Sequence, residues 1–292
     1  MSLNLTRIQY NGLTIEPGGA YTINNSGGLT GRPIRTERQD RTGEHGGNIF
    51  NQLYGMREIF FEGNILCKTP EEFFTALNAL VKAFSINENN ESLPLTIRLW
   101  DGSEKTIDAF VSLQPQVNFK GGRTTTAPFR VELIAEDGAF RSLTPVLDPA
   151  TGNLPQIKLG KVGGSPVPTP VPFPVGSGGS TGEIILVNSG SESAFAKFTI
   201  NGAVINPRIT NKTTGKFIEV QTTLLFGESL TIEMKSTGES VTKGSADYYE
   251  FVDGEIFKIA PGSNILSFTA NQYSETALLT VEFYNRYLTI TG

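Results

Sequence analysis

Cysteine and histidine are almost missing from this chain of 292 residues, which contains one of each, Cys67 and His45. A single cysteine cannot form a disulfide within the chain, and one cysteine with one histidine cannot supply the usual ligand set of a zinc site. We therefore expect neither a disulfide-stabilised scaffold nor a metal centre, and we expect no cofactor.

Charged side chains are also few, at 18% of the chain, against about a quarter in ordinary globular proteins. Lys+Arg 24 and Asp+Glu 29 leave a net charge of -5, which disfavours direct nucleic-acid recognition because that needs basic side chains opposite the phosphates. No apolar run approaches the ~20 residues that cross a bilayer. The start, MSLNLTRIQYNG, lacks the pattern of a secretion signal. We expect no membrane insertion and no Sec-type secretion.

Glycine and proline, by contrast, are abundant, at 32 and 16 residues. Prolines occupy every second position from Pro166 to Pro174 in the segment KVGGSPVPTPVPFPVGSGGS, residues 161–180. Because proline fixes φ and lacks an amide hydrogen, this segment cannot form a helix or a central strand. It is predicted to be a stiff polyproline II spacer, and it fits an SH3-type ligand poorly. We expect residues 161–182 to link two domains, 1–160 and 183–292.

Tight turns are predicted where Asn-Gly or Asp-Gly pairs separate β-rich runs, because these residues tolerate the positive φ of type I′ hairpins. The strongest hairpin patterns surround 101–102 and 253–254, where apolar residues alternate on both sides. Such turns without a βαβ rhythm indicate antiparallel sandwiches or barrels. We expect a mainly β chain, with an N-terminal antiparallel β-sandwich followed by a second β-sandwich. The pairs begin at Asn11, Asp101, Asp137, Asn201 and Asp253.

One helix is predicted in TPEEFFTALNALVKAF, which starts at Thr69. Thr69 is a good N-cap, Pro70 suits the first helical position, and Glu72 completes a capping box. The first domain is therefore expected to hold one packed helix and the second none. One buried stripe is expected from the helical spacing of Phe73, Leu77, Leu80, Val81 and Phe84.

Patterns that carry catalysis are weak throughout the chain. Residues 178–182 match the string G-x-S-x-G, but a nucleophile elbow needs a strand before it, and here the proline-rich segment precedes it. His45 is the one imidazole available as a base, and nothing in the sequence nominates a partner serine. Strand alternation and a turn explain the acidic residues between Asp247 and Glu255. We predict that the protein is not an enzyme.

The segment GRPIRTERQDRTGEHGGN, residues 31–48, carries an arginine at every third position among acidic residues. Its proline and glycines argue against a long helix. One interpretation is a solvated charged surface. A second is an arm that contacts a neighbouring subunit through salt bridges, because the planar guanidinium pairs bidentately with carboxylates. Phosphate binding is a third. The residues assigned to this contact are Arg32, Arg35, Arg38, Arg41 and His45.

Two groups of sequence strings resemble the distal tail proteins of long-tailed, non-contractile bacteriophages. The first is RTGEHGGNIFNQLYGMREIFFEGNIL, residues 41–66, which contains an R-x-I-x-x-x-G strand and precedes the helix. The second is ILVNSGSESAFAKFTINGAVINPRITNKTTGKFIEV, residues 185–220, followed by FKIAPGSNILSFTA and ALLTVEFYNRYL. The strings follow the order typical of that family and cover most of the chain outside the proline-rich segment.

The resemblance implies a structural virion protein at the distal end of the tail, assembled in the host cytoplasm. The N-terminal domain would form a homohexamer, a ring that joins the tail tube protein to a tail-tip or baseplate hub protein. A receptor-binding protein is a further candidate partner. The second sandwich would be galectin-like. The long proline-rich segment departs from the family and leaves the position of this outer domain open.

Two other functions remain open from the residues alone. A carbohydrate-binding adhesion module on a stalk would use exposed aromatic side chains of the second domain, and Tyr273 is the candidate for ligand contact. Packing within a hairpin explains Tyr248 and Tyr249 more simply. A hydrolase would have to use His45.

Overall fold

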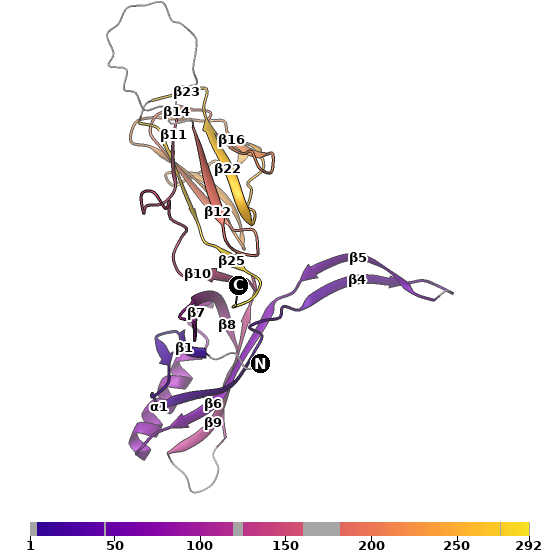
Figure 1. Ribbon diagram of the computed structural model, residues 1–292, viewed down its shortest axis with the longest axis vertical. Coiled ribbons are helices and arrows are strands. Elements are labelled where there is room, and N and C mark those ends of the chain that lie inside the picture. The colour runs from indigo at the N-terminus through magenta and orange to yellow at the C-terminus, as the bar shows by residue number, and fades with distance from the viewer. Residues whose placement is uncertain (1–4, 44, 119–124, 160–181, 275, 292) are drawn as a thin grey trace, which may run out of the picture. The chain divides into compact units, whose positions relative to one another are not determined.

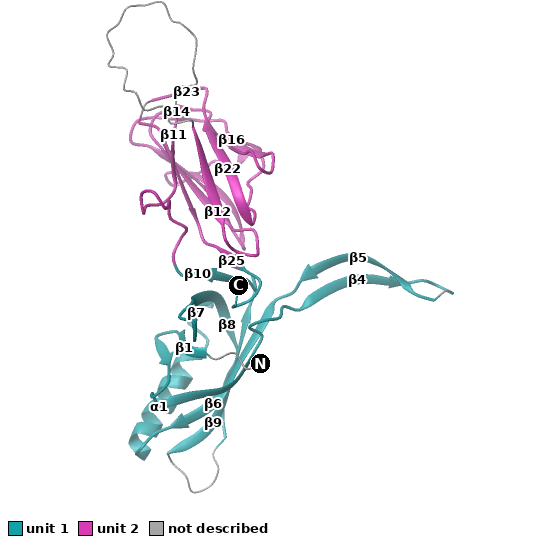
Figure 2. Cartoon of the chain, viewed as in Figure 1, with its two compact units in different colours: residues 1–143, 287–292 teal, residues 144–286 magenta. Residues whose placement is uncertain are grey.

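The computed structural model describes residues 5–43, 45–118, 125–159, 182–274 and 276–291 (Figure 1). The chain divides into two compact units (Figure 2). Unit 1 comprises residues 1–143 and 287–292, and unit 2 comprises residues 144–286. The chain therefore leaves unit 1 once and returns to it at its C-terminal end.

The proline-rich segment does not separate these units, which corrects the predicted domains 1–160 and 183–292. Described residues on both sides of it belong to unit 2. Ile157 of β11 (Gln156–Lys158) pairs with Leu279, and the carbonyl of Gly182 accepts a hydrogen bond from the Phe268 amide at 2.8 Å. Long-range strand pairing, which composition does not reveal, thus holds both flanks in one unit. The predicted polyproline II geometry falls on residues 160–181, which lie outside the described residues.

Unit 1 is built on an antiparallel sheet in the order β2-β1-β7-β8-β9-β6-β3. The long strand β8 has register shifts; its first half pairs with β7 and its second half with β9. Buried side chains of both parts, such as Ile97 and Phe61, belong to one core. The elements are β1 (Leu5–Tyr10), β2 (Leu13–Ile15), β3 (Tyr21–Gly27), β4 (Ile34–Asp40), β5 (Gly47–Tyr54), β6 (Arg57–Leu66), α1 (Pro70–Ala83), β7 (Leu93–Leu99), β8 (Glu104–Val117), β9 (Thr126–Ala135) and β10 (Phe140–Ser142).

Helix α1 begins as predicted. The Thr69 hydroxyl accepts a hydrogen bond from the Glu72 amide at 3.2 Å, and the Glu72 carboxylate accepts one from the Thr69 amide at 3.3 Å, so the capping box is complete. The buried face differs from the predicted stripe, because Val81 is 40% exposed. Alanines take part in the packing instead, which lets the helix backbone approach the sheet. The buried residues of the helix are Phe73, Ala76, Leu80 and Ala83.

Two of the predicted turns in unit 1 form hairpins. Asn11 and Gly12 both have positive φ, at 44° and 80°, and join β1 to β2 as expected for a type I′ turn. Asp101 and Gly102 join β7 to β8, but the loop has three residues because Leu99 donates its amide hydrogen to the Ser103 carbonyl at 2.9 Å. The pair at 137–138 joins β9 to β10, which do not pair with each other.

Unit 2 is a sandwich of two main antiparallel sheets, in the orders β11-β24-β13-β18-β19-β20 and β12-β22-β15-β16-β21. Inward side chains of both sheets form a second core, with Phe198 and Phe268 fully buried. Its elements after β11 are β12 (Glu183–Asn188), β13 (Ala196–Asn201), β14 (Val204–Ile205), β15 (Arg208–Asn211), β16 (Lys216–Val220), β17 (Thr223–Leu224), β18 (Ser229–Lys235), β19 (Gly238–Lys243), β20 (Ala246–Asp247), the 3₁₀ helix η1 (Tyr249–Phe251), β21 (Val252–Gly254), β22 (Gly262–Thr269), β23 (Gln272–Tyr273), β24 (Leu278–Phe283) and β25 (Arg286–Tyr287), which crosses the unit boundary.

The hairpin predicted at residues 253–254 is wrong. Asp253 lies inside β21 and pairs with Glu219 of β16. The chain beyond it enters the core at Phe257, 1% exposed, instead of returning along β21. The pair at 201–202 also leads between strands that do not pair, β13 and β14. The predicted class is nevertheless confirmed: a mainly β chain, with a helix-bearing N-terminal sandwich and a C-terminal sandwich.

Candidate functional site

The arginine-rich segment forms a β-hairpin, which we call the arm, residues 34–54. Within the described part of the chain, its strands β4 and β5 pair only with each other, from Ile34 opposite Tyr54 to Asp40 opposite Gly47. Figure 2 shows it extending from the sheet of unit 1. All residues of β5 are exposed. An isolated two-stranded hairpin is only marginally stable in water. We therefore expect the arm to pack against the surface of a partner.

The base of the arm is fixed within its own chain. The amide of Gly55 donates to the Pro33 carbonyl at 2.8 Å, which closes the hairpin. The Arg32 guanidinium donates through Nε to the Gly55 carbonyl at 3.1 Å and through Nη2 to the Asp137 carbonyl, and it lies 5.0 Å from the centroid of the Tyr54 ring. Arg32, predicted to contact another subunit, thus has an intramolecular function.

A second arginine, Arg57, holds the segments around this base together. It is fully buried, and its guanidinium donates to the carbonyls of Gly138 and Gly28, both at 2.6 Å, and of Gly31, at 2.9 Å. It also donates to Leu288 and lies 4.9 Å from the Phe140 ring centroid. Sequence reasoning did not assign this function, although a charged residue at an inward position of an alternating strand is a signal for it.

Arg57 and Gly63 are also the outer positions of the R-x-I-x-x-x-G string. A Cβ at Gly63 would lie 1.7 Å from the Thr22 carbonyl oxygen of the adjacent strand β3. Glycine is therefore the residue that lets β3 and β6 approach here. The structure therefore explains both residues of the string: Arg57 binds backbone carbonyls, and Gly63 leaves room for the adjacent strand.

The remaining predicted contact residues lie on the arm and are exposed. Arg35 pairs with Leu53 and Arg38 with Ile49, and neither arginine has a hydrogen bond or ion pair with a described residue. At the tip, Arg41 donates through Nη2 to the Asn48 side chain at 3.3 Å, and its amide donates to the Gly46 carbonyl at 3.0 Å. His45 lies exposed in this tip loop. The structure thus brings four of the five predicted residues onto one projecting element.

Apolar side chains of the arm are a feature that sequence reasoning missed. They are each 46% to 65% exposed, and they surround a bulge where the register shifts between Glu37 and Arg38. The run NIFNQLYGM could have been read as a core strand, and only the absence of a covering sheet reveals its exposure. Several large exposed apolar side chains on one element indicate a candidate interaction site. These side chains are Ile34, Ile49, Phe50, Leu53 and Tyr54, and Met56, just beyond the arm, is exposed in the same range.

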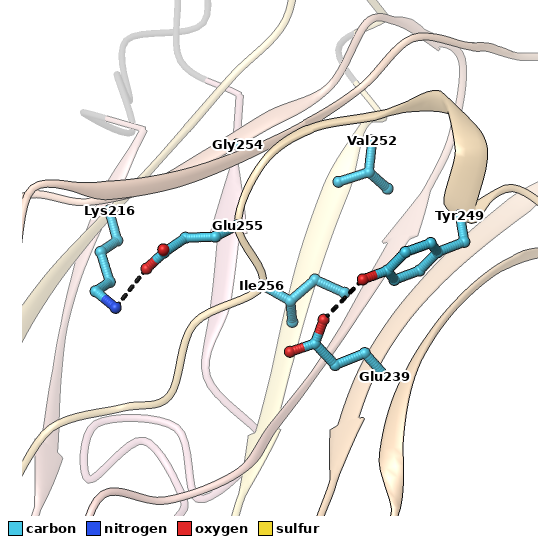
Figure 3. A pocket seen from close by; sticks show the side chains of 7 residues that line it. All are labelled: Lys216, Glu239, Tyr249, Val252, Gly254, Glu255 and Ile256. Atoms are coloured by element: carbon cyan, nitrogen blue, oxygen red, sulfur yellow. Dashed lines mark hydrogen bonds and ion pairs between the residues drawn. The ribbon is translucent and has the colours of Figure 1, made fainter.

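Unit 2 contains an open pocket of about 370 Å³, lined by seven residues (Figure 3). The Tyr249 hydroxyl donates a hydrogen bond to the Glu239 carboxylate at 3.1 Å, and this bond raises the pKa of Tyr249. Lys216 and Glu255 form an ion pair on the other side. The lining residues are Lys216, Glu239, Tyr249, Val252, Gly254, Glu255 and Ile256.

The three tyrosines considered as ligand contacts lie in different environments. Tyr248 packs partly against the core of unit 2, with its ring centroid 5.2 Å from that of Phe251. Tyr249 does not lie in a hairpin; it begins the 3₁₀ helix η1 and is 49% exposed. Tyr273 pairs with Val204 on a small sheet and is not part of the pocket lining.

The described residues show no arrangement for metal or nucleophilic chemistry. They contain no group of three or more His, Cys, Asp or Glu side chains that could hold a metal ion. His45 has no hydrogen bond or ion pair with a described residue, and the G-x-S-x-G string, apart from Gly182, lies outside them. In the same part of the chain no helix is long and apolar enough to cross a membrane.

The two β units, the capped helix and the arm together define a two-part, mainly β fold. Residues 189–287 match the family model described as siphovirus-type tail component, C-terminal domain. The crystal structure of the Dit protein of phage SPP1 is similar with a TM-score of 0.67 and 11% identity, over 97% of this chain and 99% of that one. The SPP1 protein is a paradigm of the hub adsorption apparatus in phages that infect Gram-positive bacteria.

A chain of the phage P2 baseplate, in its activated conformation with Ca, is similar with a TM-score of 0.51 and 12% identity. The match covers 98% of this chain and 99% of that one. Among curated proteins no sequence matches. The resemblance to distal tail proteins is thus confirmed, by sequence for residues 189–287 and by fold for nearly the whole chain.

Proposed function

We propose that this protein is a structural component of a siphovirus-type tail that forms a homohexameric hub. In this function the ring joins the tail tube protein to a tail-tip or baseplate protein at the distal end of the virion tail, and assembles in the host cytoplasm. A receptor-binding protein is a further partner. The family match of residues 189–287 and the fold shared with the SPP1 Dit protein support a tail function rather than an enzymatic one.

The observation that carries the proposal is the arm. It presents exposed apolar side chains together with Arg35 and Arg38, which have no described intramolecular partner. On the arm these arginines lie directly opposite exposed apolar residues, Arg35 opposite Leu53 and Arg38 opposite Ile49, and aromatic residues and arginine are enriched at protein interfaces. Since the arm projects from one side of unit 1, its natural receptor is a different surface of the next copy. Such heterologous contacts close into rings.

The mass and shape of the purified protein test this proposal. Light scattering should give six times the mass of the 31.6 kDa chain, and negative-stain images should show rings. The double variant Arg35→Glu with Arg38→Glu should shift the protein toward smaller species without changing its unfolding temperature, as should Phe50→Ser. The double variant Lys82→Glu with Lys235→Glu makes the same change of charge away from the arm and should leave rings intact.

A monomer at high concentration, without rings, would contradict the hub. Rings that survive all three arm substitutions would contradict the assignment of the contact to the arm, while leaving the ring itself in place. The two failures are therefore distinguishable.

A further inference from the structure

The pocket of unit 2 lies where the chain passes from one sheet of the sandwich to the other. β20 is an edge strand of the six-stranded sheet, and β21 is an edge strand of the five-stranded sheet. The 3₁₀ helix η1 connects these two strands along the chain. The pocket is lined by residues of β16, β19, η1, β21 and the segment that follows β21 (Figure 3). Its volume of about 370 Å³ lies within the range of small-molecule sites, about 300–1,000 Å³.

The middle of the pocket is apolar. Val252 and Ile256 supply aliphatic side chains, and the Tyr249 ring stands beside them with half of its surface exposed (Figure 3). Gly254 also lines the pocket, and it contributes backbone atoms only. A Cβ there would lie 2.3 Å from the Phe217 carbonyl, and the residue has a φ of 91°, so both space and backbone conformation require glycine.

Polar groups stand on both sides of this apolar middle. On one side the Glu239 carboxylate accepts the Tyr249 hydroxyl bond, and on the other Lys216 pairs with Glu255. Each carboxylate retains lone pairs for further donors, and the ammonium has three hydrogens of which the ion pair does not use all. Because internal partners already hold these groups, they are oriented before a ligand arrives, which lowers the entropic cost of binding.

We propose that this pocket binds one hexopyranose ring of a polysaccharide. Such a ring has a face of C–H groups, which matches the Tyr249 ring and the two aliphatic side chains, and a rim of hydroxyls, which can donate to carboxylates and accept from an ammonium. An apolar ligand would leave the polar groups unpaired, which is unfavourable. A simple ion is not favoured, since groups of both signs line the pocket and are paired. The proposal does not depend on ring formation.

The test measures sugar binding to the full-length protein by saturation-transfer NMR. The probes are glucose, galactose, N-acetylglucosamine, N-acetylgalactosamine and rhamnose, each at millimolar concentration. At least one should bind the unaltered protein. Tyr249→Ala and Glu255→Gln should each weaken that sugar at least tenfold. Tyr249→Phe, which keeps the ring and loses the hydroxyl, should weaken it less. Tyr273→Ala, which changes a tyrosine of unit 2 outside the pocket lining, is the matched control and should bind as the unaltered protein does.

Binding that is lost in the pocket variants and kept in Tyr273→Ala supports the proposal. Failure of all five sugars to bind overturns it, as does binding that survives both Tyr249→Ala and Glu255→Gln. Loss of binding in Tyr273→Ala alone would place a sugar site elsewhere in unit 2 and overturns it too. If Tyr249→Ala lowers the unfolding temperature, the sugar binding of Glu255→Gln and Tyr249→Phe tests the proposal instead. Both substitutions alter exposed polar groups and preserve the apolar middle of the pocket.

Discussion

Arg57 shows at the scale of one residue how backbone carbonyls can satisfy a buried guanidinium. Its donors are directed at four carbonyls from three separate segments, represented by Gly28, Gly138 and Leu288. Arginine suits this position because its guanidinium presents five donors in a fixed plane, whereas a lysine ammonium concentrates its donors at one point. The base of the arm, the end of β9 and the C-terminal end of the chain are thus joined at one side chain.

We predict that Arg57→Met lowers the free energy of unfolding of unit 1 by roughly 3 kcal/mol or more, because several buried carbonyls lose their donor and each costs about 1–3 kcal/mol. Arg57→Lys should recover only part of this loss. Urea unfolding followed by circular dichroism measures both. Arg35→Lys on the exposed arm is the control and should change stability by less than about 0.5 kcal/mol. Equal stability of Arg57→Met and the unaltered protein would contradict the structural function of Arg57.

Helix α1 shows at the scale of an element which features are local. Its start is specified by four adjacent residues, since the Thr69 side chain and the Glu72 side chain bind each other's backbone amide. Its buried face is specified by the sheet, which contacts Ala76 and Ala83 and leaves Val81 exposed. The cap was therefore predictable from the sequence, and the orientation of the helix was predictable only in part.

Removing the cap should destabilise unit 1 by a modest amount. Thr69→Ala deletes the side-chain acceptor for the Glu72 amide, and such losses cost about 1 kcal/mol. Thermal unfolding should show a lower midpoint. Thr75→Ala, at an exposed position inside the same helix, is the matched control and should be neutral or slightly stabilising, because alanine is the better helix former. An unchanged midpoint for Thr69→Ala would show that the cap contributes nothing in this context.

At the scale of the whole molecule, the chain ends in the unit where it began. Ile290 is fully buried in the core of unit 1, its amide donates to the Leu29 carbonyl at 3.1 Å, and the Tyr287 ring centroid lies 3.9 Å from the Lys105 ammonium. Unit 2 is therefore an insertion between two parts of unit 1. The stability of unit 1 should depend on residues that follow unit 2 in the sequence.

Truncation after Arg286 should lower the unfolding temperature of unit 1 and leave that of unit 2 unchanged. The burial of Ile290 alone is worth about 2 kcal/mol, and the truncation also removes an acceptor of Arg57. Scanning calorimetry of the full chain and the truncated chain separates the two transitions. Ile290→Ala should reproduce much of the effect, while Thr291→Ala, next to it and exposed, should not. Loss of both transitions together would show that the units do not unfold separately.

The sequence by itself determined what depends on neighbouring residues: the capped start of α1, the type I′ turn at Asn11 and Gly12, and the mainly β class. Tertiary structure decided whatever depends on distant partners. Pairing of β11 with β24 places both flanks of the proline-rich segment in unit 2, and burial of Phe257 turns the expected hairpin at Asp253 into an edge strand. Local patterns encode turns and caps, but strand order and exposure follow from contacts between residues far apart in the chain. For the same reason the carbonyl contacts of Arg57, the exposure of the apolar side chains of the arm and the pocket beside Tyr249 could be recognised only in the folded molecule.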